Sequence, residues 1–164
     1  TSLGITKSHV FAAVGGNNGG SYSEALWAQA TQKQGTLTAF CPVAGGADFV
    51  VGVVTPETYK RAGIYRAWTL YQQMMGLPVA EELDFTVDPV FGQELRDRET
   101  IQLNKGDGLT VETGKIYKGD IPVMKLISIT NYGHGNCPAV ARISWDYMKH
   151  FARNRQTGEL IYNP

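Results

Sequence analysis

Two titratable residues, Asp48 and His134, each follow a short apolar segment and a glycine-rich turn. Asp48 ends the run Ala44-Gly45-Gly46-Ala47-Asp48, and His134 stands between Gly133 and Gly135. An imidazole with little steric cover suits a general base, and a neighbouring carboxylate could hold its tautomer and stabilise its protonated form. These residue types favour chemistry in which His134 removes a proton from a nucleophile while Asp48 orients it.

Each residue also has a purely structural interpretation. An aspartate beside a glycine turn often serves only the turn, and a single histidine after a strand is often a structural or surface residue. The order and the matching context of the two residues favour the chemical interpretation. In an open α/β sheet, ligands bind outside the carboxyl ends of the strands, so both side chains are expected at one edge of the sheet.

The elements that must position these residues alternate between strands and helices. Short apolar runs predict buried strands at 10–14, 37–41 and 123–130. Cap and breaker residues predict helices over 21–34, from Thr55 to about Gly76, and from Pro138 to about Asn154. Because strands alternate with helices, the predicted fold class is α/β, with a mostly parallel sheet and flanking helices.

The second predicted helix and the segment after it differ in pattern. In the helix, apolar residues recur at spacings of three and four, which predicts a buried stripe of Ile64, Ala67, Trp68, Tyr71 and Met75. The following residues, 81–120, are polar and rich in turn formers. They predict a loop with a hairpin across 101–117, turned at Lys105-Gly106-Asp107-Gly108.

Composition excludes several classes of partner. The chain has 164 residues, enough for about one domain, and its formal net charge is +0. Because it has neither a basic stripe nor an apolar run long enough to cross a bilayer, no nucleic acid or membrane partner is expected. No metal-ligand spacing surrounds Cys41 or Cys137, so no metal or other cofactor is expected. A small or neutral substrate fits this composition.

The same two cysteines lie near the two candidate residues in the sequence. Cys41 belongs to the strand that leads to Asp48, and Cys137 follows His134. If the two loops are neighbours, a disulfide could join them. The alternative is a pair of buried thiols, and the sequence leaves both possibilities open.

Three stretches of the chain, 10–20, 37–48 and 124–154, resemble esterases related to polyhydroxybutyrate depolymerases and feruloyl esterases. The last stretch is the most similar. It has a strand, then Gly133-His134, then a helix with Ile143-Ser144-Trp145-Asp146-Tyr147-Met148, and a Trp-Asp-aromatic helix after the histidine is frequent in that family.

The resemblance implies a partial α/β-hydrolase fold. Residues 1–164 would form the C-terminal portion of a single hydrolase domain, with an insertion at about 79–120. The implied activity is hydrolysis of a feruloyl, acetyl or polyhydroxyalkanoate-type ester, with Asp48 as the acid and His134 as the base of a catalytic triad. The family also suggests an extracellular, secreted protein whose substrate is a small or polymeric ester.

The chain departs from the family pattern in one respect that matters for chemistry. It contains no Gly-x-Ser-x-Gly, the turn that carries the nucleophilic serine in this family. The serine and the oxyanion hole are therefore expected on an N-terminal segment or a partner chain. Without that partner, these residues alone are expected to be inactive.

The identity of the acid is left open by the spacing. The separation of Asp48 from His134 is long for the family, so Asp84, Asp88 or Asp120 could replace Asp48 as the acid. Asp48 is the preferred candidate because it follows the glycine turn that the family has at this place.

Aromatic residues are candidates for an acyl or aryl pocket. Trp27, Tyr65 and Trp68 offer large apolar surfaces with a polar group, which suits substrate binding. Tyr65 and Trp68 also lie on or beside the predicted buried stripe, and the helical spacing favours that interpretation for both.

Two other functions remain possible from the sequence. Thr1 could act as an N-terminal nucleophile with its own α-amine as base, although no obvious strand follows it. Alternatively, the chain could be a non-catalytic binding module that keeps a hydrolase architecture without the serine.

Overall fold

A computed structural model of the chain describes residues 13–17, 38–50, 52–103 and 108–164. In chain order the elements are β1 (Ala13–Asn17), β2 (Ala39–Gly45), the 3-10 turn η1 (Tyr59–Arg61), α2 (Gly63–Met74), β3 (Arg96–Gln102), β4 (Thr110–Lys118), β5 (Ile121–Ile129), α3 (Pro138–Met148), β6 (Phe151–Arg153) and β7 (Leu160–Tyr162). The helix predicted over 21–34 lies outside the described residues.

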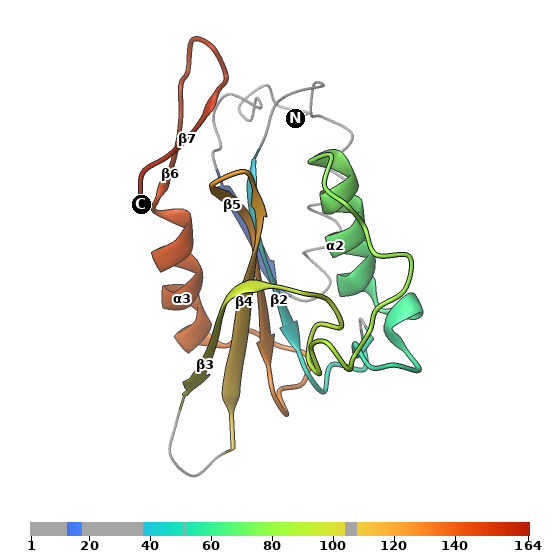
Figure 1. Cartoon of the computed structure of the whole chain (residues 1–164). Helices are drawn as coiled ribbons and strands as arrows, with labels where there is room; N and C mark the ends of the chain where they lie inside the picture. Colours follow the sequence, from blue (N-terminus) through green and yellow to red (C-terminus); the bar gives the residue numbers. More distant parts are fainter. Residues whose placement is uncertain (1–12, 18–37, 51, 104–107) are drawn as a thin grey trace.

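The centre of the fold is one five-stranded sheet in the order β1-β2-β5-β4-β3. Figure 1 shows α2 on one face of this sheet and α3 on the other. β1, β2 and β5 are parallel neighbours. β4 pairs antiparallel with β5, and β3 pairs antiparallel with β4. β6 and β7 form a separate two-stranded hairpin.

The prediction of a mostly parallel sheet, and with it a partial α/β-hydrolase fold, is wrong. The sheet is mixed, and its antiparallel part is the larger one. The cause lies in the polar segment that the sequence predicted as a loop with one hairpin. That hairpin exists as β3 and β4, but it is longer than predicted and supplies two strands of the sheet itself. The predicted turn at 105–108 lies outside the described residues except for Gly108.

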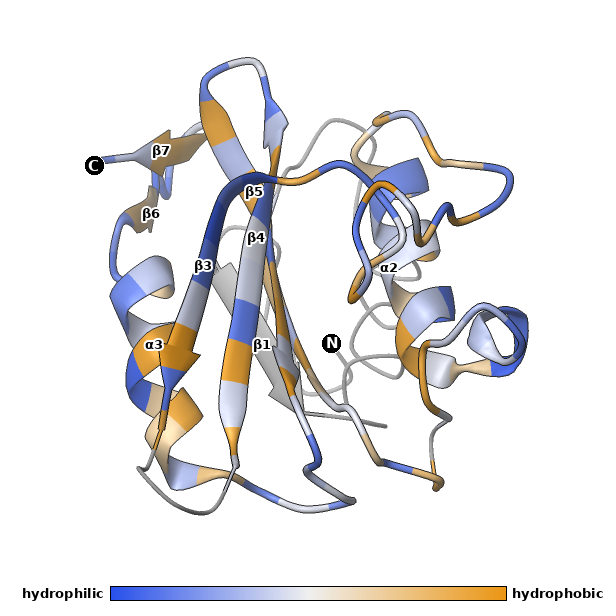
Figure 2. Cartoon of the chain, turned by 60° about the horizontal axis from the view of Figure 1, so that its bottom comes forward, coloured by the Kyte–Doolittle hydropathy of each residue, from blue (hydrophilic) through white to orange (hydrophobic). Residues whose placement is uncertain are grey.

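The connection between β4 and β5 fixes the antiparallel direction. Only Gly119 and Asp120 separate the two strands, and Gly119 has a φ of 60°. Two residues can join only antiparallel neighbours, because a parallel connection needs a crossover of a dozen residues or more. β3 lies at the outer edge and is mostly hydrophilic, as Figure 2 shows, which protects an exposed strand edge from further pairing.

The predicted stripe of α2 is confirmed. Ile64, Ala67, Trp68, Tyr71 and Met75 are all buried, and they pack on Phe40, Met124 and Leu126 of the sheet. The rings of Phe40 and Tyr71 stack with their centroids 4.2 Å apart. Burying each such side chain contributes roughly 1.5–3 kcal/mol, so this face of the sheet holds much of the core. The helix begins at Gly63, later than the predicted start at Thr55.

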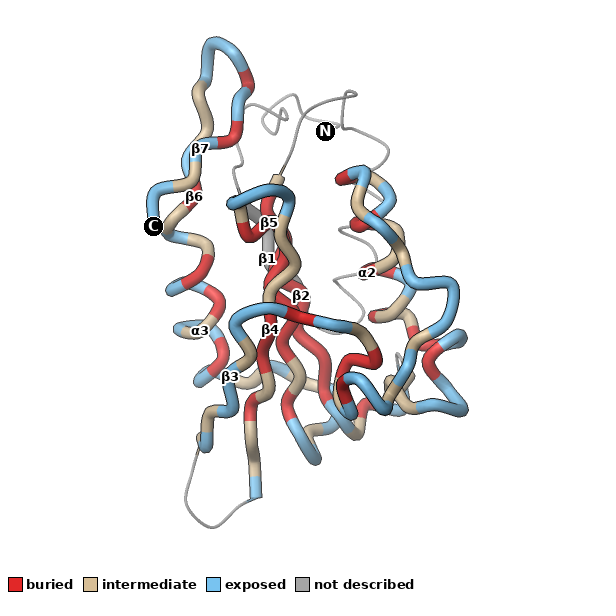
Figure 3. Tube along the Cα trace, in the orientation of Figure 1, coloured by how far each residue is buried: buried red, intermediate tan, exposed pale blue. Residues whose placement is uncertain are grey.

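The other face of the sheet is covered by α3. This helix begins at Pro138, as predicted, and buries Val140 and Tyr147 against Ile127 and Ile129. It ends at Met148, earlier than predicted, and the residues from Phe151 form β6 instead. In Figure 3 the buried residues concentrate in the strands between the two helices.

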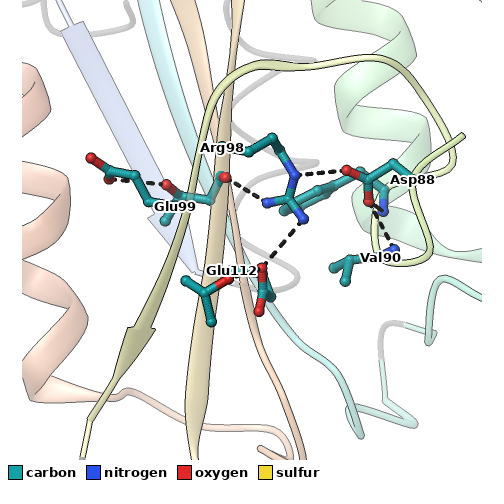
Figure 4. Close-up of polar contacts among 8 residues, drawn as sticks. Asp88, Val90, Arg98, Glu99 and Glu112 are labelled. Atoms are coloured by element: carbon teal, nitrogen blue, oxygen red, sulfur yellow. Dashed lines mark hydrogen bonds and ion pairs between the residues drawn. The ribbon is translucent and has the colours of Figure 1, made fainter.

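An ion pair between the buried Asp88 and the half-buried Arg98 attaches the loop before β3 to the sheet. Arg98 donates from Nε to Asp88 Oδ2 at 2.7 Å, and its other nitrogens reach Thr113 O and Glu112 Oε2, as Figure 4 shows in part. Asp88 also accepts the backbone N–H groups of Val90 and Phe91 at 2.9 and 2.8 Å. The carboxylate therefore holds both the turn of this loop and the guanidinium of the hairpin.

Replacing Arg98 by Met is expected to lower the free energy of unfolding by about 2 kcal/mol, because Asp88 would remain buried without its counter-ion. Urea denaturation measures the change. The matched control is Lys60→Met, which removes an ion pair with Glu82 whose two side chains are 63% and 75% exposed and which should leave stability unchanged. Equal losses in the two variants would show that Arg98 contributes no more than a surface charge.

Candidate active site

The candidate site forms where β2 and β5 end side by side. The two strands are parallel neighbours and Gly45 is paired with Ile129 at the end of their ladder, so their carboxyl ends meet at one edge of the sheet. Two backbone hydrogen bonds then join the following turns. Gly46 N–H donates to Ile129 O at 2.7 Å, and Ala47 N–H donates to Tyr132 O at 2.9 Å. The turn that leads to Asp48 is thereby fixed against the turn that leads to His134.

Gly45 permits this close approach. A Cβ at this position would lie 2.5 Å from Tyr132 O and 2.8 Å from Gly133 O, which is closer than such atoms can come. Only a residue without a side chain allows the two turns to touch. By contrast, a Cβ on Gly133, directly before the histidine, would meet nothing within 4 Å.

The two side chains meet in the geometry of a carboxylate–imidazole pair. His134 Nδ1 lies 2.9 Å from Asp48 Oδ2 and 3.2 Å from Oδ1. Asp48 is fully buried, with a side chain 1% exposed, whereas the side chain of His134 is 49% exposed. Asp48 Oδ1 also accepts the backbone N–H of Val50 at 3.0 Å, which holds the carboxylate in place. The expected proximity of these two residues is therefore present, and their catalytic role remains a prediction.

This pairing determines where the imidazole can act. Because a carboxylate oxygen accepts, the contact with Asp48 favours the tautomer of the neutral imidazole that carries its proton on Nδ1 and its lone pair on Nε2. Within the described part of the chain, no hydrogen bond occupies Nε2. A half-exposed ring with a buried carboxylate on one nitrogen and an open second nitrogen can accept a proton from a hydroxyl group or a water molecule.

The three alternative acids lie elsewhere. Asp84 accepts the N–H and hydroxyl of Thr86 in its own turn, Asp88 pairs with Arg98, and Asp120 is exposed in the turn between β4 and β5. None of these described carboxylates contacts His134.

A pocket of about 200 Å³ opens on the α2 side of the same turns. It shares Gly45 and Gly46 with the turn that carries Asp48, and its walls include Val54, Val90 and Asn131. Four hydroxyl or amide side chains, those of Thr55, Ser128, Thr130 and Asn131, give it polar groups, and no charged side chain lines it among the described residues. The pocket therefore suits a small, uncharged group.

The predicted aromatic residues contribute less than expected. Trp68 lines this pocket but is only 1% exposed, so it belongs mainly to the core of α2. Its indole N–H finds no acceptor among the described residues. Tyr65 packs edge-on against Tyr59 rather than on the pocket, and Trp27 lies outside the described residues, as does Thr1.

The sequence did not predict most of the pocket. Its walls come from residues 52–55, from the loop that Asp88 holds, and from the end of β5. Of its wall residues, the sequence had indicated Gly45 and Gly46, in the turn before Asp48, and Trp68. Asn131 has a left-handed φ of 58°, which suits asparagine after a strand. The others are ordinary turn residues whose positions depend on tertiary contacts.

Of the two possibilities that the sequence left open, the structure has no disulfide between the two cysteines. Cys41 and Cys137 are both thiols; Cys41 is buried in β2, and Cys137 is half-buried at the start of α3. The residues that the structure describes also contain no cluster of three or more His, Cys, Asp or Glu side chains that could hold a metal ion. Among the described helices, none is long and apolar enough to span a membrane.

No model of a known protein family matches this chain, and no curated protein matches its sequence. The resemblance to esterases therefore depends only on the residues quoted for it.

The Gly45→Ala variant is expected to lose about 1–3 kcal/mol of unfolding free energy, because its new methyl group would collide with two carbonyl oxygens of the His134 loop. Gly133→Ala, in the same loop and with open space around it, should stay within about 0.5 kcal/mol of the parent. Chemical denaturation of both variants measures the difference. A Gly45→Ala protein as stable as Gly133→Ala would refute the close contact of the two turns.

Proposed function

We propose that the protein hydrolyses small, uncharged carboxylic esters, with His134 as the general base and Asp48 as the residue that orients it. The observation that carries the proposal is the 2.9 Å contact between His134 Nδ1 and the buried carboxylate of Asp48, which leaves Nε2 open. A buried carboxylate on one side and solvent on the other is the arrangement that general-base catalysis at a hydroxyl group requires.

The proposed reaction follows from these two side chains. Nε2 of His134 takes the proton of a hydroxyl nucleophile while its oxygen attacks the ester carbonyl. The same proton then passes to the departing alkoxide as the tetrahedral intermediate collapses to an acyl-enzyme, and water repeats the cycle to release the acid. Asp48 stabilises the imidazolium in both steps.

The nucleophile in this proposal is a serine outside the described residues. No serine or threonine hydroxyl in the described ranges hydrogen-bonds to His134. We therefore expect the serine, together with the N–H groups that stabilise the oxyanion, on an N-terminal segment or partner chain. The half-exposed ring of His134 leaves room for such a group to approach.

The substrate class follows from the surroundings of the pair. The pocket beside the Gly45-Gly46 turn has no charged lining among the described residues, so a charged acyl group would lose its hydration there without compensation. Phe49 and Val50, directly after Asp48, are 88% and 72% exposed. An apolar acyl or aryl ester could cover these two side chains, which is consistent with feruloyl or hydroxyalkanoate esters.

When the proposed nucleophile is present, His134→Ala is expected to reduce the hydrolysis of p-nitrophenyl acetate by about 10²- to 10⁴-fold, since it removes the general base. Asp48→Asn should cause a loss of similar order, because asparagine can hold the His134 imidazole in the wrong tautomer. His150→Ala is the matched control, because that histidine hydrogen-bonds a backbone carbonyl of Asn163 far from Asp48. Unchanged turnover in His134→Ala would exclude the proposed role.

Filling the pocket tests the substrate class. Val90→Trp is expected to raise KM for p-nitrophenyl butyrate at least tenfold more than for the acetate. The pocket has a volume of only about 200 Å³, and the larger side chain would fill much of it. Val87→Trp, in the same loop but 58% exposed and outside the pocket, should change neither. Identical acyl-length profiles in the two variants would place the substrate elsewhere.

A further inference from the structure

A second pocket, of about 330 Å³, lies on the α3 side of the sheet. Two lysines from the strands, Lys115 and Lys125, line it together with Tyr147 and His150 from the end of α3 and the residues after it. Unlike the pocket beside Asp48, this one is mostly polar and contains charged side chains, so it suits a different class of ligand.

Lys125 is the unusual residue of this pocket. It stands in the middle of β5, and its side chain is only 9% exposed. Its nearest carboxylate oxygen, Glu99 Oε2, is 3.7 Å away, which is beyond hydrogen-bonding distance. Among the described residues, Nζ of Lys125 makes no hydrogen bond. A buried ammonium is costly unless it makes hydrogen bonds, and in the described residues Lys125 has only this longer ion pair.

Lys115 adds a second positive charge to the pocket that contains Lys125. In the β4–β5 ladder it stands directly opposite Lys125, so both side chains lie on the same face of the sheet. Like charges opposite each other on neighbouring strands are destabilising. Lys115 has a partner in Asp97 Oδ2 of β3 at 2.9 Å.

Two carboxylates, those of Glu99 and Asp146, also line this pocket. Asp146 is bound by Lys149 at 2.7 Å and lies 3.8 Å from Arg142, and the hydrogen bond from Lys149 lowers its pKa. Lys125 also acts on Asp146 electrostatically, but less than Lys149 and Arg142 do. Glu99 is the carboxylate that forms an ion pair with Lys125, and its side chain is 56% exposed.

The remaining walls would accept the uncharged part of a ligand. Ile101 and Ile143 give an apolar surface beside the lysines. His150 donates from Nδ1 to the carbonyl of Asn163 at 2.8 Å, which fixes the orientation of its ring at the pocket rim. A volume of this size is typical of sites for small organic molecules.

We propose that Lys115 and Lys125 bind the oxyanion group, phosphate or carboxylate, of a small organic ligand in this pocket. The oxyanion supplies the hydrogen-bond acceptors that Lys125 lacks and reduces the repulsion between the two ammonium groups. The site is separate from the Asp48–His134 pair and does not depend on the ester hydrolysis proposed above.

Thermal unfolding in increasing concentrations of sodium phosphate or sodium acetate, each compared with sodium chloride at the same ionic strength, tests the proposal. The unfolding midpoint of the parent protein should rise with the concentration of a binding oxyanion, because binding stabilises only the folded state. A rise in phosphate alone identifies a phosphate ligand, and a rise in acetate identifies a carboxylate.

The Lys125→Met variant makes this test specific. It should lose the oxyanion-dependent rise, while Lys60→Met, an exposed lysine of another region, keeps it. In chloride alone, Lys125→Met should unfold no earlier than the parent, because methionine fills the same volume without a buried charge. A lower midpoint in chloride would mark Lys125 as a structural ion-pair residue. That lower midpoint would overturn the proposal. So would an equal oxyanion response in Lys125→Met and the parent, or no response in the parent.

Discussion

The arrangement of this protein depends on the parallel pairing of β2 and β5. Their ladder ends with Gly45 beside Ile129, and two backbone hydrogen bonds carry the pairing on into the turns. As a result, two residues separated by 86 positions in the sequence come within hydrogen-bonding distance. Asp48 is buried by the same contacts that bring it to His134, so the fold determines both the geometry and the burial of the pair.

The sequence predicted the parts of this site that depend on local pattern. Apolar runs followed by glycine turns located the strand ends that carry Asp48 and His134, and the spacing of apolar residues located the buried face of α2. These signals are local, since burial and turn formation are decided within a few residues. The opening of α3 by Pro138 was predictable for the same reason.

The antiparallel pairing of β4 with β5 was not predicted, although the sequence contains a signal for it. Gly119-Asp120 between two strand-like stretches is a two-residue hairpin connection, which requires antiparallel neighbours. The polar, charged sequence of β3 favoured a loop for the whole segment before this turn, because an edge strand does not need apolar alternation. Resemblance to a family with parallel strands then favoured the wrong topology.

The charged pocket could not be predicted from local pattern at all. Lys115 and Lys125 are ten positions apart, and nothing in either stretch reveals that the register places them opposite each other. Register depends on the hairpin turn and on the packing of both faces. The molecule thus has two different environments, an uncharged pocket beside the Asp48–His134 pair on the α2 side and a charged pocket under α3.

The most direct test of the central claim is nitrogen NMR of the protein labelled with ¹⁵N-histidine, with the His134 signals assigned by their loss in a variant at that position. If Asp48 orients the imidazole, neutral His134 will carry its proton on Nδ1, and replacing Asp48 by asparagine will shift the proton toward Nε2. A His134 ring with its proton on Nε2 in the parent protein, unaffected by Asp48, would contradict the account.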